Sequence, residues 1–415
     1  FQDISIPLEF KFKENYKNLN NINDKIEMIF NNYDKEYYKF NSYLNKIFNE
    51  SELNSAFMLG VNLQNNRKLT KSYNYSSDGN DIFRIASMTK VITTVAALQQ
   101  VESGLIGINE PLNNIVPELA DVPCINKEGS MTRSNADITM KHLITHTAGF
   151  GYFFTSDELE NYLGKAPFGK DLIQHQMSLR LFEPGESFRY GTNIDWLGKA
   201  VETLSGKNLE QYFRDHITGP LGMDSTWFIP PEHLKHRIVN YYHKDKDTYT
   251  VAGERIPKKS NFFSGGGGLL SSPNDYLKFL TCLVNGGKNE DFLMLQEQTV
   301  RSMFEDQLEK NIDIKFPKMS FNHQWIGKGN FISDLEGCRW GYGWALETRK
   351  NDYLRPKGAA FWAGLYNSYF TIDPLNQVIV LYFSQFFPFN DKSVSYTHLR
   401  AHETVLDLVC RLLLE

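Results

Sequence analysis

Apolar residues recur along this chain with two different spacings, and each change of spacing marks a predicted element. Between Asn23 and Ile47 they follow the three-and-four spacing of one long amphipathic helix. The apolar positions of that helix are Ile26, Ile29, Phe30, Tyr33, Tyr37, Phe40, Leu44 and Ile47. Residues 56–62 and 68–75 instead resemble two strands joined by a turn at Asn65-Asn66, which predicts a hairpin.

A second helix is predicted to begin close to Ser87. Phe83, Ile85 and Ala86 have the character of a strand end. The apolar run of the helix then continues through Val91, Ile92, Val95, Ala96 and Leu98, and Gly104 can end the helix at its C-cap. Ser87 is therefore predicted to lie where a strand passes into a helix.

The same patterns divide the chain into larger units. Residues 1–50 form the N-terminal helix region, and residues 107–260 are mainly helical with long loops. Strands rich in aromatic and β-branched residues return after Gly265 and end at 378–383. The prediction is an α/β fold (α+β) in which residues 51–106 and 261–393 build one sheet unit, interrupted in sequence by the helical one.

The last 22 residues, 394–415, differ in style from the rest of the chain, because Asn and Lys disappear while Arg, His and Leu become frequent. They resemble a translated linker rather than a native end. We expect this foreign tail to carry no function, although its Leu and Val residues could still form a helix.

Composition narrows the possible functions. The chain has 415 residues, of which 41% are hydrophobic, and a net charge of -5. This balance gives no basic field for nucleic acid, and no apolar run is long enough to span a membrane, so small molecules are the expected partners. The four cysteines form no Cys-x-x-Cys pair, which fits a reducing, cytoplasmic setting. Because the chain opens at Phe1, a targeting segment could be missing, and the oligomeric state stays open.

Ser87-Met88-Thr89-Lys90 carries the strongest chemical signal. Residues three apart share a helix face, so the Lys90 amine can reach back to the Ser87 hydroxyl. A serine is a poor nucleophile until a base takes its proton, and burial together with the helix dipole can make a lysine that base. The alternative is an ordinary N-cap serine followed by a solvated lysine.

Other motifs are weaker and have structural alternatives. Tyr190, on a turn before a helix, could reach into a cleft, although packing is the commoner role of a tyrosine. The four glycines at 265–268 lack the Gly-Lys-Ser/Thr of a phosphate loop, and they precede a helix that Ser272 caps, with Pro273 at its first position and Asp275 in a capping-box position.

His142 and His146 are four residues apart, as in zinc-binding helices, but the glutamate of His-Glu-x-x-His is missing. Core histidines are the favoured interpretation, and no metal is predicted. Near the C-terminus, Phe361-Trp362-Ala363-Gly364-Leu365 and Tyr369-Phe370-Thr371-Ile372 predict two strands joined by a turn. The backbone N–H groups of Leu365 and Ser87 could together bind an oxyanion, while an ordinary hairpin is the alternative.

In order and spacing, a set of motifs resembles the β-lactamase-related serine hydrolases, the superfamily of class C β-lactamases and penicillin-binding proteins. They are residues 83–90, 142–149, 183–185, Tyr190, 219–223 and 267–272, and the resemblance covers roughly Ser55 to Pro388. It implies an antiparallel sheet flanked by helices, with an inserted helical subdomain. It also implies that Ser87 is acylated, that Lys90 and Tyr190 move protons, and that the strand edge near Trp362 binds the acyl group, with no cofactor.

The chain departs from the β-lactamases and peptidases of that superfamily at two motifs. Thr192 stands where Tyr-x-Asn would have its asparagine, with Asn193 one residue late, and both are candidate substrate-binding residues. Trp362-Ala363-Gly364 replaces Lys-Thr-Gly, so Trp362, Ala363, Gly364 and Leu365 are the candidates for the third motif. These features are similar to the family VIII carboxylesterases.

Without the lysine, a substrate carboxylate lacks its partner, which favours a carboxylesterase for small neutral esters. Two alternatives stay open. One is a β-lactamase or D-amino-acid peptidase-like hydrolase that uses another cation, such as Arg84, on an ester or amide substrate. The other is a non-catalytic binding relative, which the intact Ser87, Lys90 and Tyr190 disfavour.

Overall fold

The computed structural model describes residues 55–133, 136–163, 172–245, 248–253, 256, 261–316, 326–327, 335–349 and 355–391. The predicted N-terminal helix and the predicted foreign tail lie outside these residues. No helix among the described segments is long and apolar enough to cross a membrane.

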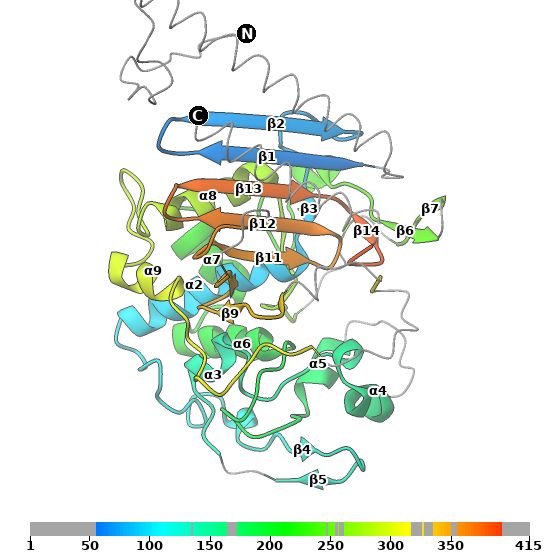
Figure 1. Ribbon diagram of the computed structural model, residues 1–415, viewed down its shortest axis with the longest axis vertical. Coiled ribbons are helices and arrows are strands. Elements are labelled where there is room, and N and C mark those ends of the chain that lie inside the picture. The colour runs from blue at the N-terminus through cyan, green and yellow to red at the C-terminus, as the bar shows by residue number, and fades with distance from the viewer. Residues whose placement is uncertain are drawn as a thin grey trace, which may run out of the picture.

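A seven-stranded antiparallel sheet dominates the fold (Figure 1), with the order β2-β1-β13-β12-β11-β10-β9. The strands are β1 Ala56–Asn62, β2 Arg67–Tyr73, β9 Arg339–Trp340, β10 Ala345–Leu346, β11 Ala360–Gly364, β12 Ser368–Asp373 and β13 Val378–Phe383. The predicted hairpins at both ends of the sequence are present, and β1 pairs with β13 through Leu59 and Leu381. The predicted fold, one antiparallel sheet split in sequence around helices, is confirmed.

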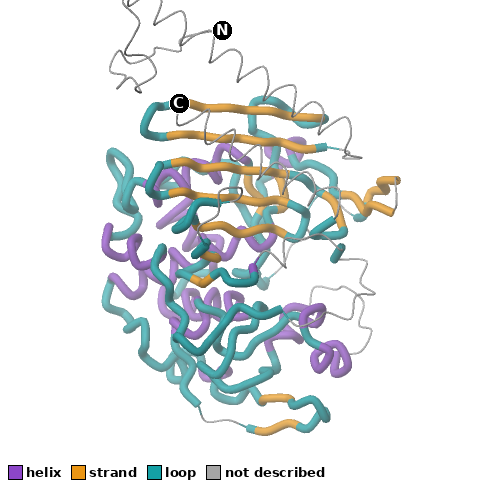
Figure 2. Tube along the Cα trace, viewed as in Figure 1, coloured by secondary structure: helices purple, strands orange, loops and turns teal. Residues whose placement is uncertain are grey.

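Helices pack beside this sheet and form a largely helical layer below it in the views of Figures 1 and 2. The α-helices are α2 Thr89–Glu102, α3 Met140–Ile144, α4 Asp157–Leu163, α5 Leu172–Met177, α6 Asn193–Ser205, α7 Leu209–Phe213, α8 Pro273–Val284 and α9 Glu297–Met303. Short helical turns occur at η2 Ala86–Met88, η3 Pro117–Leu119, η4 Phe153–Thr155, η5 Arg214–Thr218 and η6 Glu232–Arg237.

Three small sheets complete the described structure. They are β3 Phe83–Arg84 with β8 Leu270–Ser271, β4 Cys124–Ile125 with β5 Met131–Thr132, and β6 Tyr242–Asp245 between β7 Thr248–Val251 and β14 Phe386–Phe387. The sheet formed by β6, β7 and β14 joins the region predicted to be mainly helical to the C-terminal strands. The pairing of β3 with β8 ties the segment before Ser87 to the segment after the four glycines.

Helix α2 is the central helix of the molecule. Its side chains are buried on every side, including those of Thr93 and Thr94, which is typical of a helix enclosed by other elements rather than of a surface helix. Gly104 follows the C-cap residue Ser103 with a left-handed φ of 73°, a conformation that glycine adopts without a Cβ penalty. The predicted end of the helix is therefore correct.

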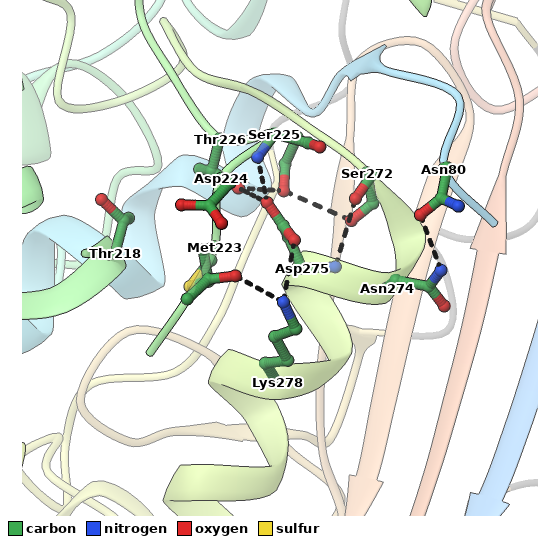
Figure 3. A network of polar contacts seen from close by, with 12 residues as sticks. Asn80, Thr218, Met223, Asp224, Ser225, Thr226, Ser272, Asn274, Asp275 and Lys278 are labelled. Carbon is green, nitrogen blue, oxygen red and sulfur yellow. Dashed lines mark hydrogen bonds and ion pairs between the residues drawn. The ribbon is translucent and has the colours of Figure 1, made fainter. Parts of the chain in front are cut away.

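The start of α8 also follows the sequence pattern, with one difference (Figure 3). Ser272 Oγ accepts a hydrogen bond from Asp275 N at 3.2 Å, as expected of an N-cap. The Asp275 carboxylate instead accepts from Ser225 N at 2.7 Å and from Thr226 Oγ1 at 3.0 Å. Asp275 therefore anchors the loop between η5 and η6 rather than closing a capping box with Ser272.

Candidate active site

Ser87 lies in the short turn η2, between the strand β3 and the helix α2. Ile85 N donates to Leu269 O at 3.1 Å, which fixes the chain just before the serine. Ala86 has a φ of 43°, in the left-handed region that a residue with a Cβ rarely adopts. Strained backbone of this kind concentrates at functional sites, and here it holds a half-buried Ser87 at the junction of the two elements.

Lys90, in the first turn of α2, is brought to Ser87 as predicted. Its side chain is 1% exposed, and Nζ lies 3.1 Å from Ser87 Oγ. Nζ also donates to Tyr152 OH at 3.0 Å and to Gly266 O at 2.5 Å. Three oxygen partners match the three protons of an ammonium. If that ammonium loses a proton, the amine is positioned to accept the hydrogen of Ser87.

Tyr190 also lies close to the Lys90 amine. The Lys90 Nζ atom is 4.8 Å from the centroid of the Tyr190 ring, and the phenol oxygen accepts a hydrogen bond from Trp362 Nε1 at 3.0 Å. The rings of Tyr190 and Trp362 are tilted against each other with centroids 4.9 Å apart. The structure therefore groups the Ser-x-x-Lys pair, the tyrosine and the third motif in one place.

The third motif reaches Ser87 through the end of β11. A Cβ on Gly364 would lie 2.4 Å from Ile85 O, so only a glycine allows the strand to approach the turn that carries the nucleophile. Trp362 and Ala363 are each 4% exposed, and Leu365 follows in the turn to β12. This approach supports the predicted pairing of the Leu365 and Ser87 N–H groups, which stays a prediction.

Thr192 and Asn193, the other candidate substrate-binding residues, occupy the start of α6 and are completely buried. Asn193 Nδ2 contacts His146 Nδ1 at 3.0 Å and donates to Phe150 O at 2.9 Å and Arg189 O at 3.1 Å. In this position the Asn193 amide holds together the loops that carry Tyr190 and Tyr152. That arrangement gives Asn193 a structural task, and its predicted role in substrate binding stays a prediction.

The two spaced histidines have structural roles, His142 at a helix start and His146 in the core. His142 Nδ1 accepts from Thr139 N at 3.3 Å and completes a capping box at the start of α3. His146 is 0% exposed, has a left-handed φ of 57°, and lies with its ring 4.7 Å from that of Tyr190. Burial, and then the charge of Lys90, hold the pKa of His146 well below its usual value. In the described segments, no cluster of three or more His, Cys, Asp or Glu side chains could hold a metal ion.

Sequence reasoning missed two residues of the site, Tyr152 and Asp195. Tyr152 accepts a hydrogen bond from Lys90, 62 positions earlier in the chain. Asp195 Oδ1 accepts from Ser264 Oγ at 2.6 Å and from Gly266 N at 3.1 Å, next to the carbonyl that binds Lys90. Both residues lie within or just after stretches that carry the resemblance, which was the one signal available in the sequence.

The sequence pattern of the family described as Beta-lactamase matches residues 58–404. The chain belongs to this family. Among relatives, it is 32% identical over 329 residues to the monacolin J acid methylbutanoyltransferase of Aspergillus terreus, covering 74% of this chain and 78% of that one. It is 30% identical over 244 residues to the lovastatin esterase of Penicillium rubens, covering 55% and 60% of the two chains.

Several solved structures have the same fold. A mutant of simvastatin synthase (LovD) from Aspergillus terreus superposes with a TM-score of 0.74 at 23% identity, over 91% of this chain and all of that one. EstCE1, a hydrolase with promiscuous acyltransferase activity, gives a TM-score of 0.69 at 18% identity, over 92% and 99%. Together with the sequence relatives, the family match identifies an enzyme of the serine hydrolase type.

Proposed function

We propose that this enzyme transfers an acyl group from a small neutral ester to an alcohol or to water, through a covalent intermediate on Ser87. The observation that carries this proposal is the buried Lys90 amine, which lies 3.1 Å from Ser87 Oγ. A pair of this kind activates a serine for attack on a carbonyl carbon.

In the first half of the reaction, the neutral Lys90 amine accepts the Ser87 proton while Oγ attacks the ester carbonyl. The resulting oxyanion would be stabilised by the N–H groups of Ser87 and Leu365. The carbon–oxygen bond to the leaving alcohol then breaks, and the alcohol takes a proton that Lys90 delivers, directly or by way of Tyr190. The products of this half are the free alcohol and an ester on Ser87.

In the second half, a new hydroxyl compound enters and attacks the Ser87 ester. Its proton passes to Tyr190 or Lys90, and the same proton returns to Ser87 Oγ as the acyl–serine bond breaks. The hydrogen bond from Trp362 Nε1 fixes the position of the Tyr190 oxygen, which orients this hydroxyl for proton transfer. Water as the acceptor gives hydrolysis, whereas an alcohol gives transfer.

The names of the relatives support acyl acceptors other than water, whereas the sequence predicted hydrolysis alone. Several of them are named as acyltransferases, among them the methylbutanoyltransferase of Aspergillus terreus, and one is named as an esterase. Both activities share the acyl-enzyme and differ only in the group that resolves it. We therefore place transfer to an alcohol first and hydrolysis as its side reaction.

The absence of the third-motif lysine supports a neutral substrate. Trp362 fills that position, and its indole packs on Tyr190 and on Trp340, with ring centroids 4.9 Å and 4.7 Å away. The guanidinium of Arg84, the cation considered in its place, lies over the ring of Tyr241 at 5.1 Å. A carboxylate bound beside the indole would bear a desolvation cost without a matching charge.

The test compares substrates and acceptors in one assay series. With p-nitrophenyl butyrate, kcat/KM should exceed that for nitrocefin by at least about tenfold, which needs only ~1.4 kcal/mol of differential transition-state binding. Adding butanol should divert the acyl group into butyl butyrate while the release of p-nitrophenol stays constant or rises. Trp362→Lys should narrow the gap between ester and nitrocefin. Nitrocefin turnover at or above the ester rate would favour the β-lactamase alternative instead.

A further inference from the structure

Asp195 is a buried carboxylate that is linked to the Lys90 amine through one intervening residue, Gly266. It lies in the first turn of α6 and is 2% exposed. Its Oδ1 atom accepts hydrogen bonds from Ser264 Oγ at 2.6 Å and from Gly266 N at 3.1 Å. The carbonyl of that same Gly266 accepts from Lys90 Nζ at 2.5 Å. The two backbone groups of one residue therefore connect the carboxylate to the proposed base.

This connection depends on residue 266 being a glycine, and it uses the Oδ1 atom of the carboxylate but not Oδ2. A Cβ on Gly266 would lie 2.4 Å from Asp195 Oδ2, so the backbone meets the carboxylate directly. Oδ2 itself is buried and has no hydrogen-bond partner within the described part of the chain. Burying an incompletely paired carboxylate is costly, and a nearby cation is what offsets that cost.

The charged and titratable groups around the Lys90–Asp195 pair come from several elements. Lys90 is on α2, and its amine interacts with Tyr152 and His146, from the loop after α3, and with Tyr190, from the loop before α6. Burial raises the pKa of Asp195, and the Lys90 charge opposes that rise. The Asp195 charge in turn raises the pKa of Tyr152, after the larger effect of burial. Asp195 and Lys90 are thus coupled through charge as well as through Gly266.

We propose that Asp195 is a positioning residue for Lys90, which holds the amine beside Ser87 through Gly266 and through its negative charge. This inference rests on the proposed acyl transfer through Ser87. Without the carboxylate, the Gly266 carbonyl loses its fixed direction, and the amine loses the opposite charge nearby.

The test is Asp195→Asn, which keeps the size of the side chain and removes its charge. We expect kcat for p-nitrophenyl butyrate to fall at least about tenfold while KM stays within about threefold, because Asp195 is 2% exposed and offers almost no surface to a substrate. Removing a buried negative charge this close to the reacting groups should move the acidic limb of the kcat/KM profile to lower pH, a change that a purely structural role would not produce.

Asp275→Asn is the matched control, because Asp275 has the same kinds of partner: a backbone N–H from Ser225 and a hydroxyl from Thr226 (Figure 3). Burial also raises the pKa of Asp275. Its network, which includes an ion pair with Lys278 at 3.5 Å, lies outside the contacts of Lys90. This variant should lose stability but keep the wild-type acidic limb.

If Asp195→Asn does not fold, Ser264→Ala replaces it, because this variant removes the 2.6 Å hydrogen bond to Asp195 and leaves the charge. It should lower kcat about twofold to fivefold, without a matching change in KM. Two results together would overturn this inference alone. The folded Asp195→Asn variant would have an unchanged kcat and an unchanged acidic limb, or the Ser264→Ala variant an unchanged kcat, and the wild-type enzyme would react with a fluorophosphonate at Ser87. A wild-type enzyme that does not react would overturn the acyl-enzyme proposal and this inference together.

Discussion

At the scale of single residues, the nucleophile directly follows a residue with a strained backbone conformation. Ala86 occupies a left-handed conformation although it has a Cβ, and the next residue is Ser87. A conformation of this kind costs on the order of 1–3 kcal/mol and persists only where the surroundings enforce it. Here the pairing of β3 with β8 on one side and the buried helix α2 on the other provide that enforcement.

Ser87→Ala should abolish labelling by a fluorophosphonate and lower esterase activity by several orders of magnitude, because no other group can take the place of the nucleophile. The matched control is Ser272→Ala, which removes a true N-cap serine from α8. That variant should lose about 0.5–2 kcal/mol of stability and keep normal labelling. Labelling that persists in Ser87→Ala, mapped by peptide mass spectrometry, would contradict the assignment.

His146 should make stability depend on pH. The pKa of His146 in the folded state lies well below 6.5. As the pH falls below 6.5, this imidazole therefore becomes protonated in the unfolded chain before it does in the folded protein. Stability is therefore unaffected by this group above a pH of about 6.5 and falls as the pH drops below it, by up to about 1.4 kcal/mol per pH unit. His142 and His216 have lowered pKa values as well and act in the same direction.

The variant His146→Asn isolates the contribution of His146 to this pH dependence, because asparagine tolerates the left-handed φ of 57° at this position. Urea unfolding between about pH 5 and 7.5 should show a shallower loss of stability for the variant than for the wild type. Parallel curves would show that His146 does not cause the slope.

The separation of the site residues along the sequence explains why some of them were predictable and others were not. Ser87 and Lys90 are three residues apart, and helix geometry alone brings their side chains together. Lys90 and Gly266 are 176 positions apart, and their contact depends on how α2, α6 and the loop before β8 pack. No periodicity encodes that distance, so the roles of Tyr152 and Asp195 became visible only in three dimensions.

At the scale of elements, the decisive contact is between the end of β11 and the turn η2. Gly364→Ala should separate them, since the new Cβ would meet Ile85 O at 2.4 Å. We expect a stability loss of roughly 1–3 kcal/mol from overpacking, together with a fall in kcat/KM of about a hundredfold as the predicted oxyanion donors move apart.

The control for this strand variant is Gly107→Ala, an exposed position where the nearest atoms to a new Cβ lie 3.5 Å away. Its activity and thermal midpoint should match those of the wild type. Equal kcat/KM in Gly364→Ala and Gly107→Ala would show that the close approach of β11 does not shape the site.

Among the elements, those with a strong local pattern were predicted well. Residues 56–62 form a strand as expected, and α2 ends where Gly104 allows. The strands β6 and β7 were missed because they lie inside the region predicted to be mainly helical. Their partner, β14, comes from the far end of the chain, and such pairing leaves no local signal.

At the scale of the whole molecule, the two ends of the described chain close one sheet. β1 lies between β2 and β13, so the first hairpin is held by a strand more than 300 residues later, with Phe57 opposite Phe383. This closure brings the C-terminal strand β11 to the N-terminal nucleophile. The sequence patterns predicted the strands on both sides, and the resemblance supplied their assembly, because periodicity does not determine the order of strands.

The candidate site and the seven-stranded sheet are both contained in the described residues between 55 and 391. The predicted foreign tail contributes none of these groups. Deleting residues 394–415 should therefore leave the hydrolysis of p-nitrophenyl butyrate within a few-fold of the full chain. A native terminal helix would cover apolar area worth about 25 cal/mol per Å², and removing such a helix would expose enough of it to make the protein aggregate. Insoluble protein after this truncation would show that the segment, whatever its origin, is structural, whereas soluble and active protein would support its foreign origin.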